Sequence, residues 1–241
     1  MTRRTRAVLI SSASLTAGAA LGAWLLKRWG YPVRAVEREV ARAPRPPVTP
    51  SATDTPGLQP EAEGVGPRFH RRYQVDVEHA TKSPAELVAC IGADIQAYVP
   101  DEIAVFKKSK GAEGALAVGD EYDIQIRSPW DGPVRVVEAA PTRFTLATLQ
   151  GHMEAGQIRF QAAEHPAAPG ALRFSIESWA RSRDGAVDFV YDELGLAKKA
   201  QQAMWTFFCE RVADDCGGQK MAEVQVLTER EADPDDPEDD G

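Results

Sequence analysis

Two side chains in the middle of the chain have the types and the spacing of an acid–base pair. His152 and Glu154 stand two residues apart, between Gly151 and Gly156. An imidazole titrates near neutral pH and can exchange a proton with a substrate or with a neighbouring carboxylate. Flanking glycines, however, permit the backbone angles of a hairpin connection, so the pair can equally cap and stiffen a turn. The residue types favour the turn, and His152 and Glu154 remain the catalytic candidates of this sequence.

A group of aromatic residues is suited to line an apolar pocket. Its members lie on the predicted strands and on the predicted C-terminal helix, where ordinary core packing is the alternative role. The candidate ligand-binding residues are Tyr122, Phe144, Phe160, Phe174, Trp179 and Trp205.

No set of residues has the spacing of a metal or cofactor site. The four histidines stand apart, no CxxC pair occurs, and GxSxG, Walker, GxGxxG and HExxH motifs are absent. Three cysteines cannot form a complete disulfide framework in one chain, which favours a reducing compartment. The sequence therefore predicts no metal and no cofactor, and it favours a protein that is not an enzyme.

Apolar periodicity indicates which elements position these residues. Residues 69–77 alternate as a strand, and Ser83 before Pro84 marks the start of a helix. Several short strands follow, and residues 187–216 have the pattern of a long helix. This order predicts an α+β protein whose curved antiparallel sheet of about six or seven strands wraps around the C-terminal helix and can enclose a cavity.

Charged residues recur on the same predicted strands. We expect them to form a ladder on the outer sheet face, with arginines paired to glutamates on neighbouring strands. The arginines are Arg127, Arg135, Arg159 and Arg173, and the glutamates are Glu121, Glu138 and Glu177.

The segment TLQGHMEAGQIRF, residues 148–160, resembles the TLxGHxExGE.xF core of an uncharacterised domain family that also occurs at the C-terminus of YndJ-like proteins. The similarity extends from Phe69 to about Val212. It departs at Met153, where the family usually has proline, and at Gln157, where glutamate is usual. The family resembles the helix-grip superfamily of START lipid-transfer domains and the birch-pollen allergen. Because the family has no established activity, the resemblance implies a shape rather than a reaction.

The N-terminus has the composition of a membrane anchor. Residues 1–45 hold nine basic and two acidic residues, and residues 7–26 are uncharged. Twenty helical residues span about 30 Å, the thickness of the hydrocarbon core of a bilayer. More Lys and Arg follow the span than precede it, which places the soluble domain in the cytoplasm. The alternative is a cleaved signal peptide and export.

The remaining segments complete the expected organisation. Residues 46–67 form a proline-rich, disordered linker, residues 68–222 the helix-grip domain, and residues 223–241 a disordered acidic tail. A net charge of −8 argues against a dedicated nucleic-acid binder. The oligomeric state is not indicated.

Taken together, the sequence predicts a single-pass membrane protein whose domain binds an apolar or amphipathic, lipid-like small molecule between the sheet and the C-terminal helix. One alternative is an envelope structural or partner-binding module with a filled core. The other is a cavity enzyme that uses His152 and Glu154.

Overall fold

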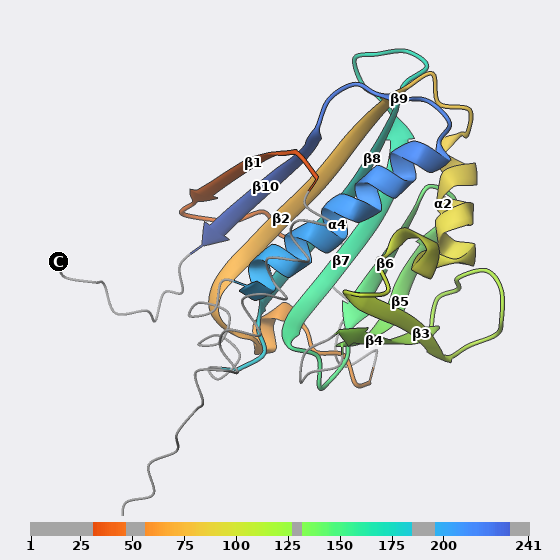
Figure 1. Cartoon of the computed structure of the whole chain (residues 1–241). Helices are drawn as coiled ribbons and strands as arrows, with labels where there is room; N and C mark the ends of the chain where they lie inside the picture. Colours follow the sequence, from red (N-terminus) through yellow and green to blue (C-terminus); the bar gives the residue numbers. More distant parts are fainter. Residues whose placement is uncertain (1–30, 47–55, 127–131, 185–195, 232–241) are drawn as a thin grey trace, which may run out of the picture.

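The computed structural model describes residues 31–46, 56–126, 132–184 and 196–231. One curved sheet forms the body of the domain, and a long helix, α4, lies diagonally across its concave face (Figure 1). The predicted anchor at residues 7–26 lies outside the described residues. None of the helices within the described ranges is long and apolar enough to cross a membrane.

Seven strands of the sheet have the order β2-β8-β7-β6-β5-β4-β3, and each neighbouring pair is antiparallel. The first of these seven strands, β2, thus pairs with the last of them, β8, and the others follow as a meander. The strands are β2 (Val65–Glu78), β3 (Ala104–Lys110), β4 (Glu121–Ile126), β5 (Gly132–Ala140), β6 (Arg143–Thr148), β7 (Glu154–Glu164) and β8 (Leu172–Ser182).

Helix α2 begins at the predicted cap, and α4 lies within the predicted helix of residues 187–216, of which residues 187–195 lie outside the described residues. The helices and the 3-10 turn between them are α2 (Pro84–Ala93), η2 (Ile95–Tyr98) and α4 (Leu196–Asp215). Ser83 accepts a hydrogen bond from the Glu86 backbone, and the Glu86 carboxylate accepts one from the Ser83 backbone, which completes a capping box. The predicted α+β class and the C-terminal helix are confirmed.

The sheet is larger than the predicted six or seven strands, because the described residues alone form ten. Strand β10 (Val224–Glu231) pairs antiparallel with the outer edge of β2, β1 (Val33–Glu39) pairs parallel with β10, and β9 (Gln219–Lys220) pairs with the end of β2. The sequence predicted that the residues of β10 belong to a disordered acidic tail and that those of β1 belong to the basic N-terminal flank. The added strands bury apolar side chains that the charge counts conceal, since Val224 and Val226 lie in the core.

Part of the expected linker also belongs to the folded domain. Leu58 is buried and bridges to Leu149, and the 3-10 turn η1 (Glu61–Glu63) contacts β7 and β8. The expected domain limits of residues 68 and 222 therefore differ from the structure, in which segments on both sides pack on the sheet.

The core lies between the concave face of the sheet and α4. Alternate residues of β2, such as Tyr73, Val75 and Val77, point inward. Four phenylalanines are completely buried there: Phe144, Phe160, Phe174 and Phe208.

Truncation tests whether residues 224–231 form a folded strand or belong to the expected disordered tail. Ending the chain after Glu223 removes β10 and exposes the edge of β2. Because Val224 and Val226 leave the core, we expect the free energy of unfolding to fall by about 3 kcal/mol or more. Urea denaturation followed by circular dichroism measures it. Ending the chain after Glu231 keeps every described strand and is the matched control; equal stabilities of the two truncated chains would contradict the assignment.

Candidate functional site

His152 supports the turn that contains it. The residue is buried between β6 and β7, and its Nδ1 accepts a hydrogen bond of 2.9 Å from the Glu154 backbone N–H. The Gln59 side chain donates to the carbonyl oxygens of both residues. Burial lowers the pKa of His152, so the imidazole is neutral and carries its proton on Nε2.

The Glu154 carboxylate points away from this imidazole and into the domain. It accepts hydrogen bonds of 3.2 Å from Arg71 Nη1 and from Gln201 Nε2 of α4. Arg71 is only 5% exposed and lies on the inward-facing side of β2, with its guanidinium 4.4 Å from the centre of the Phe69 ring. We call Arg71, Glu154 and Gln201 the inner polar cluster.

Five of the six candidate ligand residues are buried in the core between the sheet and α4. Phe160 contacts Phe144 at 4.6 Å, Trp205 at 5.6 Å and Phe208 at 5.3 Å between ring centres. Phe174 stacks on Phe208 at 5.8 Å. Tyr122 is also in this core, with Lys108 Nζ 5.5 Å from its ring centre. The aromatic rings thus pack against one another and fill this part of the interior.

Trp179 does not join this group, because it lies on the opposite face of the sheet. Phe174 and Trp179 are five positions apart in β8, and side chains alternate between faces along a strand. The Trp179 ring stacks on His70 at 5.7 Å, and the Arg159 guanidinium lies 6.0 Å from its centre.

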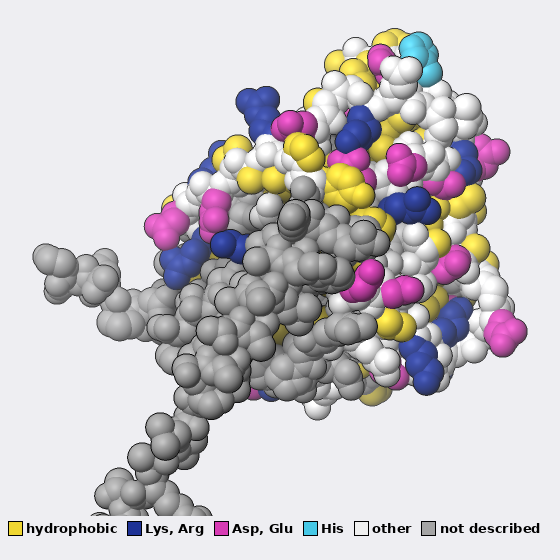
Figure 2. Space-filling view, viewed as in Figure 1, with side chains coloured by type: hydrophobic (Ala, Val, Ile, Leu, Met, Phe, Trp, Pro, Cys, Tyr) yellow, Lys and Arg dark blue, Asp and Glu magenta, His cyan; other side chains and the backbone are white. Residues whose placement is uncertain are grey.

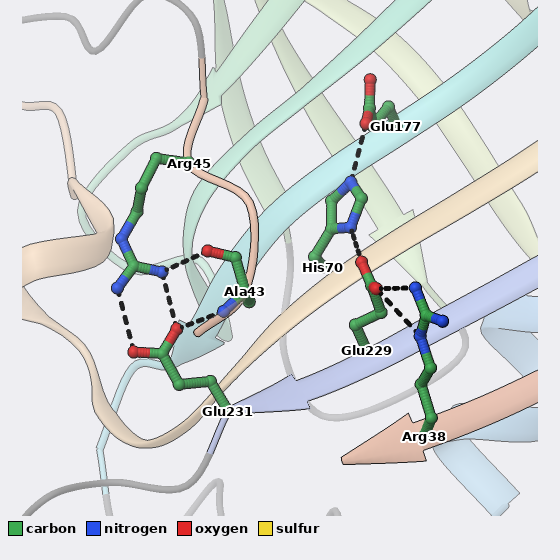
Figure 3. A network of polar contacts seen from close by, with 7 residues as sticks. All are labelled: Arg38, Ala43, Arg45, His70, Glu177, Glu229 and Glu231. Atoms are coloured by element: carbon green, nitrogen blue, oxygen red, sulfur yellow. Dashed lines mark hydrogen bonds and ion pairs between the residues drawn. The ribbon is translucent and has the colours of Figure 1, made fainter. Parts of the chain in front are cut away.

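His70 is the centre of a charge network on this outer face, which sequence analysis missed (Figure 3). The imidazole is 3% exposed, and its two nitrogens lie 2.7 Å from Glu229 of β10 and 2.7 Å from Glu177 of β8. Arg38 of β1 also donates to Glu229. Burial acts to lower the pKa of His70, but the hydrogen bonds to the two carboxylates outweigh it and raise the pKa above its usual value.

A second group of polar contacts beside this network holds the segment that follows β1. Glu231 accepts a 2.6 Å hydrogen bond from the Ala43 N–H and two bonds from Arg45 (Figure 3). The bonds from Arg45 are the main cause that lowers the pKa of Glu231 to about 2. We call residues 33–45 the strap. The opposite charges of its arginines and of the C-terminal glutamates are the sequence signal for this contact.

The predicted outer ladder is present in part. Arg135 of β5 pairs with Glu121 of the neighbouring strand β4, and Arg159 of β7 pairs with Glu138 of β5, across the intervening strand β6. Arg173 pairs instead with Asp76 of β2, and the Glu177 carboxylate pairs with His70. Arg127 lies outside the described residues.

Within the part of the chain that the structure describes, no three His, Cys, Asp or Glu side chains are grouped as metal ligands. Cys209 and Cys216 are buried thiols, and burial raises the pKa of both. Cys90 of α2 is exposed.

Comparisons with known proteins give distant structural similarities only. No family model and no curated relative matches the chain. Among solved structures, norcoclaurine synthase from Thalictrum flavum is 10% identical over 64% of this chain and 88% of that chain, with a TM-score of 0.45. The hypothetical protein jhp0584 from Helicobacter pylori is 8% identical over 60% and 86%, with a TM-score of 0.44. A conserved protein from Geobacillus kaustophilus is 11% identical over 61% and 95%, with a TM-score of 0.40.

The strand order and the helix across the concave face are consistent with a helix-grip architecture, here extended by β10 and β1. The similarity to the YndJ-type family is not confirmed by a family match.

Replacing His152 tests its role in the turn. His152→Ala leaves the buried Glu154 N–H without its acceptor, so we expect a loss of about 1–3 kcal/mol in the free energy of unfolding. His152→Asn supplies an oxygen that can accept from the backbone two residues on, and should recover part of this loss. Urea denaturation of both variants measures the difference. If alanine cost nothing, the turn would not depend on the ring.

The network of His70 makes stability depend on pH. Because the pKa of His70 is higher in the folded chain, protonation of its imidazole stabilises the folded state. This stabilisation is complete below the unfolded pKa of about 6.5 and is lost as the pH rises through the folded pKa. The stability advantage of the native chain over His70→Gln should therefore be largest near pH 6 and shrink above neutrality. Denaturation at several pH values measures it. The exposed His79, replaced by Asn, is the control, and a pH-independent difference for His70→Gln would refute a charged imidazole.

Proposed function

We propose that this chain is a membrane-anchored helix-grip domain that binds an amphipathic small molecule between its sheet and α4. Residues 148–160 support a place near the YndJ-type domains. The uncharged residues 7–26 support a single-pass anchor, with the domain on the cytoplasmic side and export after cleavage as the alternative.

The inner polar cluster is the observation that carries this proposal. Arg71 and Glu154 form an ion pair on the inner face of the sheet, beside core residues, and burying such a pair is costly. Neither charge is needed to close an apolar core, since apolar side chains of similar volume often stabilise equally well. A few convergent polar groups beside an apolar interior are what a ligand with a polar head and an apolar body requires.

The attachment of α4 supports entry at this end. Near its C-terminus, Asp215 accepts bonds from Lys82 and from the Tyr98 hydroxyl, and the Cys216 carbonyl accepts one from Thr81. Near its beginning, the Gln201 amide donates to Glu154. Because the C-terminal end is tied to other elements, movement of α4 would open the interior beside the inner polar cluster. The apolar part of a ligand would then enter between α4 and the aromatic rings.

The positions of His152 and Glu154 do not favour the enzyme alternative. The imidazole Nδ1 is used by the backbone of its own turn, and the carboxylate is paired with Arg71. Packing of the aromatic rings favours the second candidate, a partner-binding module whose core is filled.

Ligand content distinguishes these two candidates. The full chain, purified in amphipol, is extracted and the extract is analysed by mass spectrometry. We expect an amphipathic molecule enriched over bulk membrane lipid, and about a tenfold lower content in Arg71→Met, since a hydrogen bond to a charged group is lost. Arg71→Lys should restore part of it.

Arg159→Met is the matched control, because it removes an arginine that pairs with a glutamate on the outer face. Circular dichroism checks that each variant is folded. If the native chain and Arg71→Met yield the same extract, with bulk lipid only, the interior holds no ligand and the partner-binding module is the better description.

A further inference from the structure

Strand β1 forms one free edge of the sheet (Figure 1). It is exposed over nearly its whole length, so packing in the core does not dictate which side chains face which side. Its register with β10 nevertheless places Arg34, Val36 and Arg38 on the outer face of the sheet. The acidic residues Glu37 and Glu39 lie on the inner face. The strand thus carries its cations on one side and its acids on the other.

Two neighbouring strands extend this outer face. Val36 is in register with Leu227 of β10, and Leu227 is in register with Arg72 of β2, so the three side chains form one row across the sheet. Val36 is 50% exposed, and Arg34 and Arg72 are exposed as well. We call Arg34, Val36, Arg72 and Leu227 the edge patch.

The two arginines of the edge patch have no partner within the part of the chain that the structure describes. Neither side chain makes a hydrogen bond or an ion pair there. The neighbouring carboxylates of this face are engaged elsewhere. Glu229 pairs with Arg38 and His70, and Glu177 pairs with His70. The charges of Arg34 and Arg72 therefore stay available to an anion outside the chain.

Apolar side chains are exposed around the same edge. Six large hydrophobic residues of the described chain are exposed, and three of them are Tyr31, Val36 and Met221. Because Val33 is in register with Val224, Tyr31 lies beside the bend that contains Met221. Tyrosine is enriched at the headgroup level of membranes. Cations next to exposed apolar groups are typical of a surface that contacts anionic lipid.

The length of the chain brings this edge close to the bilayer, if residues 7–26 span it. Five residue steps separate Leu26 from Tyr31, and they extend at most about 18 Å. The headgroup layer on each side of the hydrocarbon core is about 5–8 Å thick. The beginning of β1 is therefore held within reach of the headgroups.

We propose that the edge patch docks on the anionic headgroups of the bilayer that holds residues 7–26. This docking rests on the anchor proposed above, and it adds the orientation of the domain and the class of lipid. Arg34 and Arg72 attract the anionic groups of the lipids, and Val36 and Tyr31 enter the headgroup layer. Each arginine near such a surface raises the ratio of docked to undocked domains by a factor of about five.

Fluorescence quenching from the headgroups tests the docking with the full chain in nanodiscs. A bimane label is attached to Gln225→Cys, whose side chain is exposed on the outer face in register with Arg34. The chain also carries Cys90→Ser, since Cys90 is exposed. The discs contain a nitroxide-headgroup phosphatidylcholine as quencher, in phosphatidylcholine alone or in an equal mixture with phosphatidylserine. We expect stronger quenching in the anionic discs, lost in about 1 M salt, where the screening length is about 3 Å.

Two matched controls make the result specific. A label on Val105→Cys lies on β3, at the opposite edge of the sheet, and should not respond to lipid charge. Arg34→Gln combined with Arg72→Gln should lower the ratio of docked to undocked domains about 25-fold, as read from the Gln225→Cys label. Lys107→Gln combined with Lys199→Gln removes two exposed cations elsewhere and should leave this ratio unchanged.

Extraction with alkaline carbonate separates failure of the docking from failure of the anchor. Release of the full chain from membranes by carbonate would contradict the anchor, and the docking with it. If the chain is retained, quenching of the Gln225→Cys label that is no stronger than that of the Val105→Cys label contradicts the docking alone. Equal quenching of the Gln225→Cys label in neutral and anionic discs contradicts it too.

Discussion

Alternation along β2 is the constraint on which the rest of the structure depends. This strand is paired on both sides, with β8 toward the meander and with β10 toward the edge. Its odd-numbered residues face α4 and include the core residues Tyr73 and Val75. Its even-numbered residues face outward and include His70 and Asp76, which hold carboxylate and guanidinium partners on neighbouring strands. A shift of one residue in register would bury these charges and expose the core.

Both surfaces that we connect with function follow from this alternation. The exception on the inner side is Arg71, a charge among core positions, and it defines the inner polar cluster. On the outer side, Arg72 belongs to the edge patch, next to the network of His70. The sheet therefore separates two chemically different environments, a largely apolar interior that holds the Arg71–Glu154 pair and an outer face with a dense network of charges (Figure 3). In the view from the α4 side, acidic and basic side chains are interspersed over the described surface and do not form one field (Figure 2).

Local patterns in the sequence predicted the elements whose signals are local. The alternation of residues 69–77, the Ser83 cap and the apolar face of the last helix lie where they were predicted. The pair of Arg135 with Glu121 also follows from adjacent strands, whereas Arg159 reaches Glu138 across β6.

Contacts between distant segments could not be predicted in this way. His70 and Glu229 are 159 positions apart, and β10 carries only Val224 and Val226 as apolar alternation beside an acidic run. Composition therefore indicated a tail where the structure has a strand. Trp179 was predicted among the interior rings because it is aromatic and lies on a predicted strand. Its odd-numbered position in β8, however, places its side chain on the opposite face from Phe174.

The parallel pairing of β1 with β10 has a mechanical consequence. Seven consecutive residue pairs, from Val33 with Val224 to Glu39 with Arg230, join the two strands. If residues 7–26 are held in a bilayer, as we propose, tension between membrane and domain acts on the N-terminal end of β1 and along its axis. The seven pairs then bear the load together, in shear, instead of separating one after another. The ion pairs of Arg38 with Glu229 and of Arg45 with Glu231 add resistance toward the C-terminal end of the strap. The load between the N-terminal segment and the domain is therefore shared by many bonds.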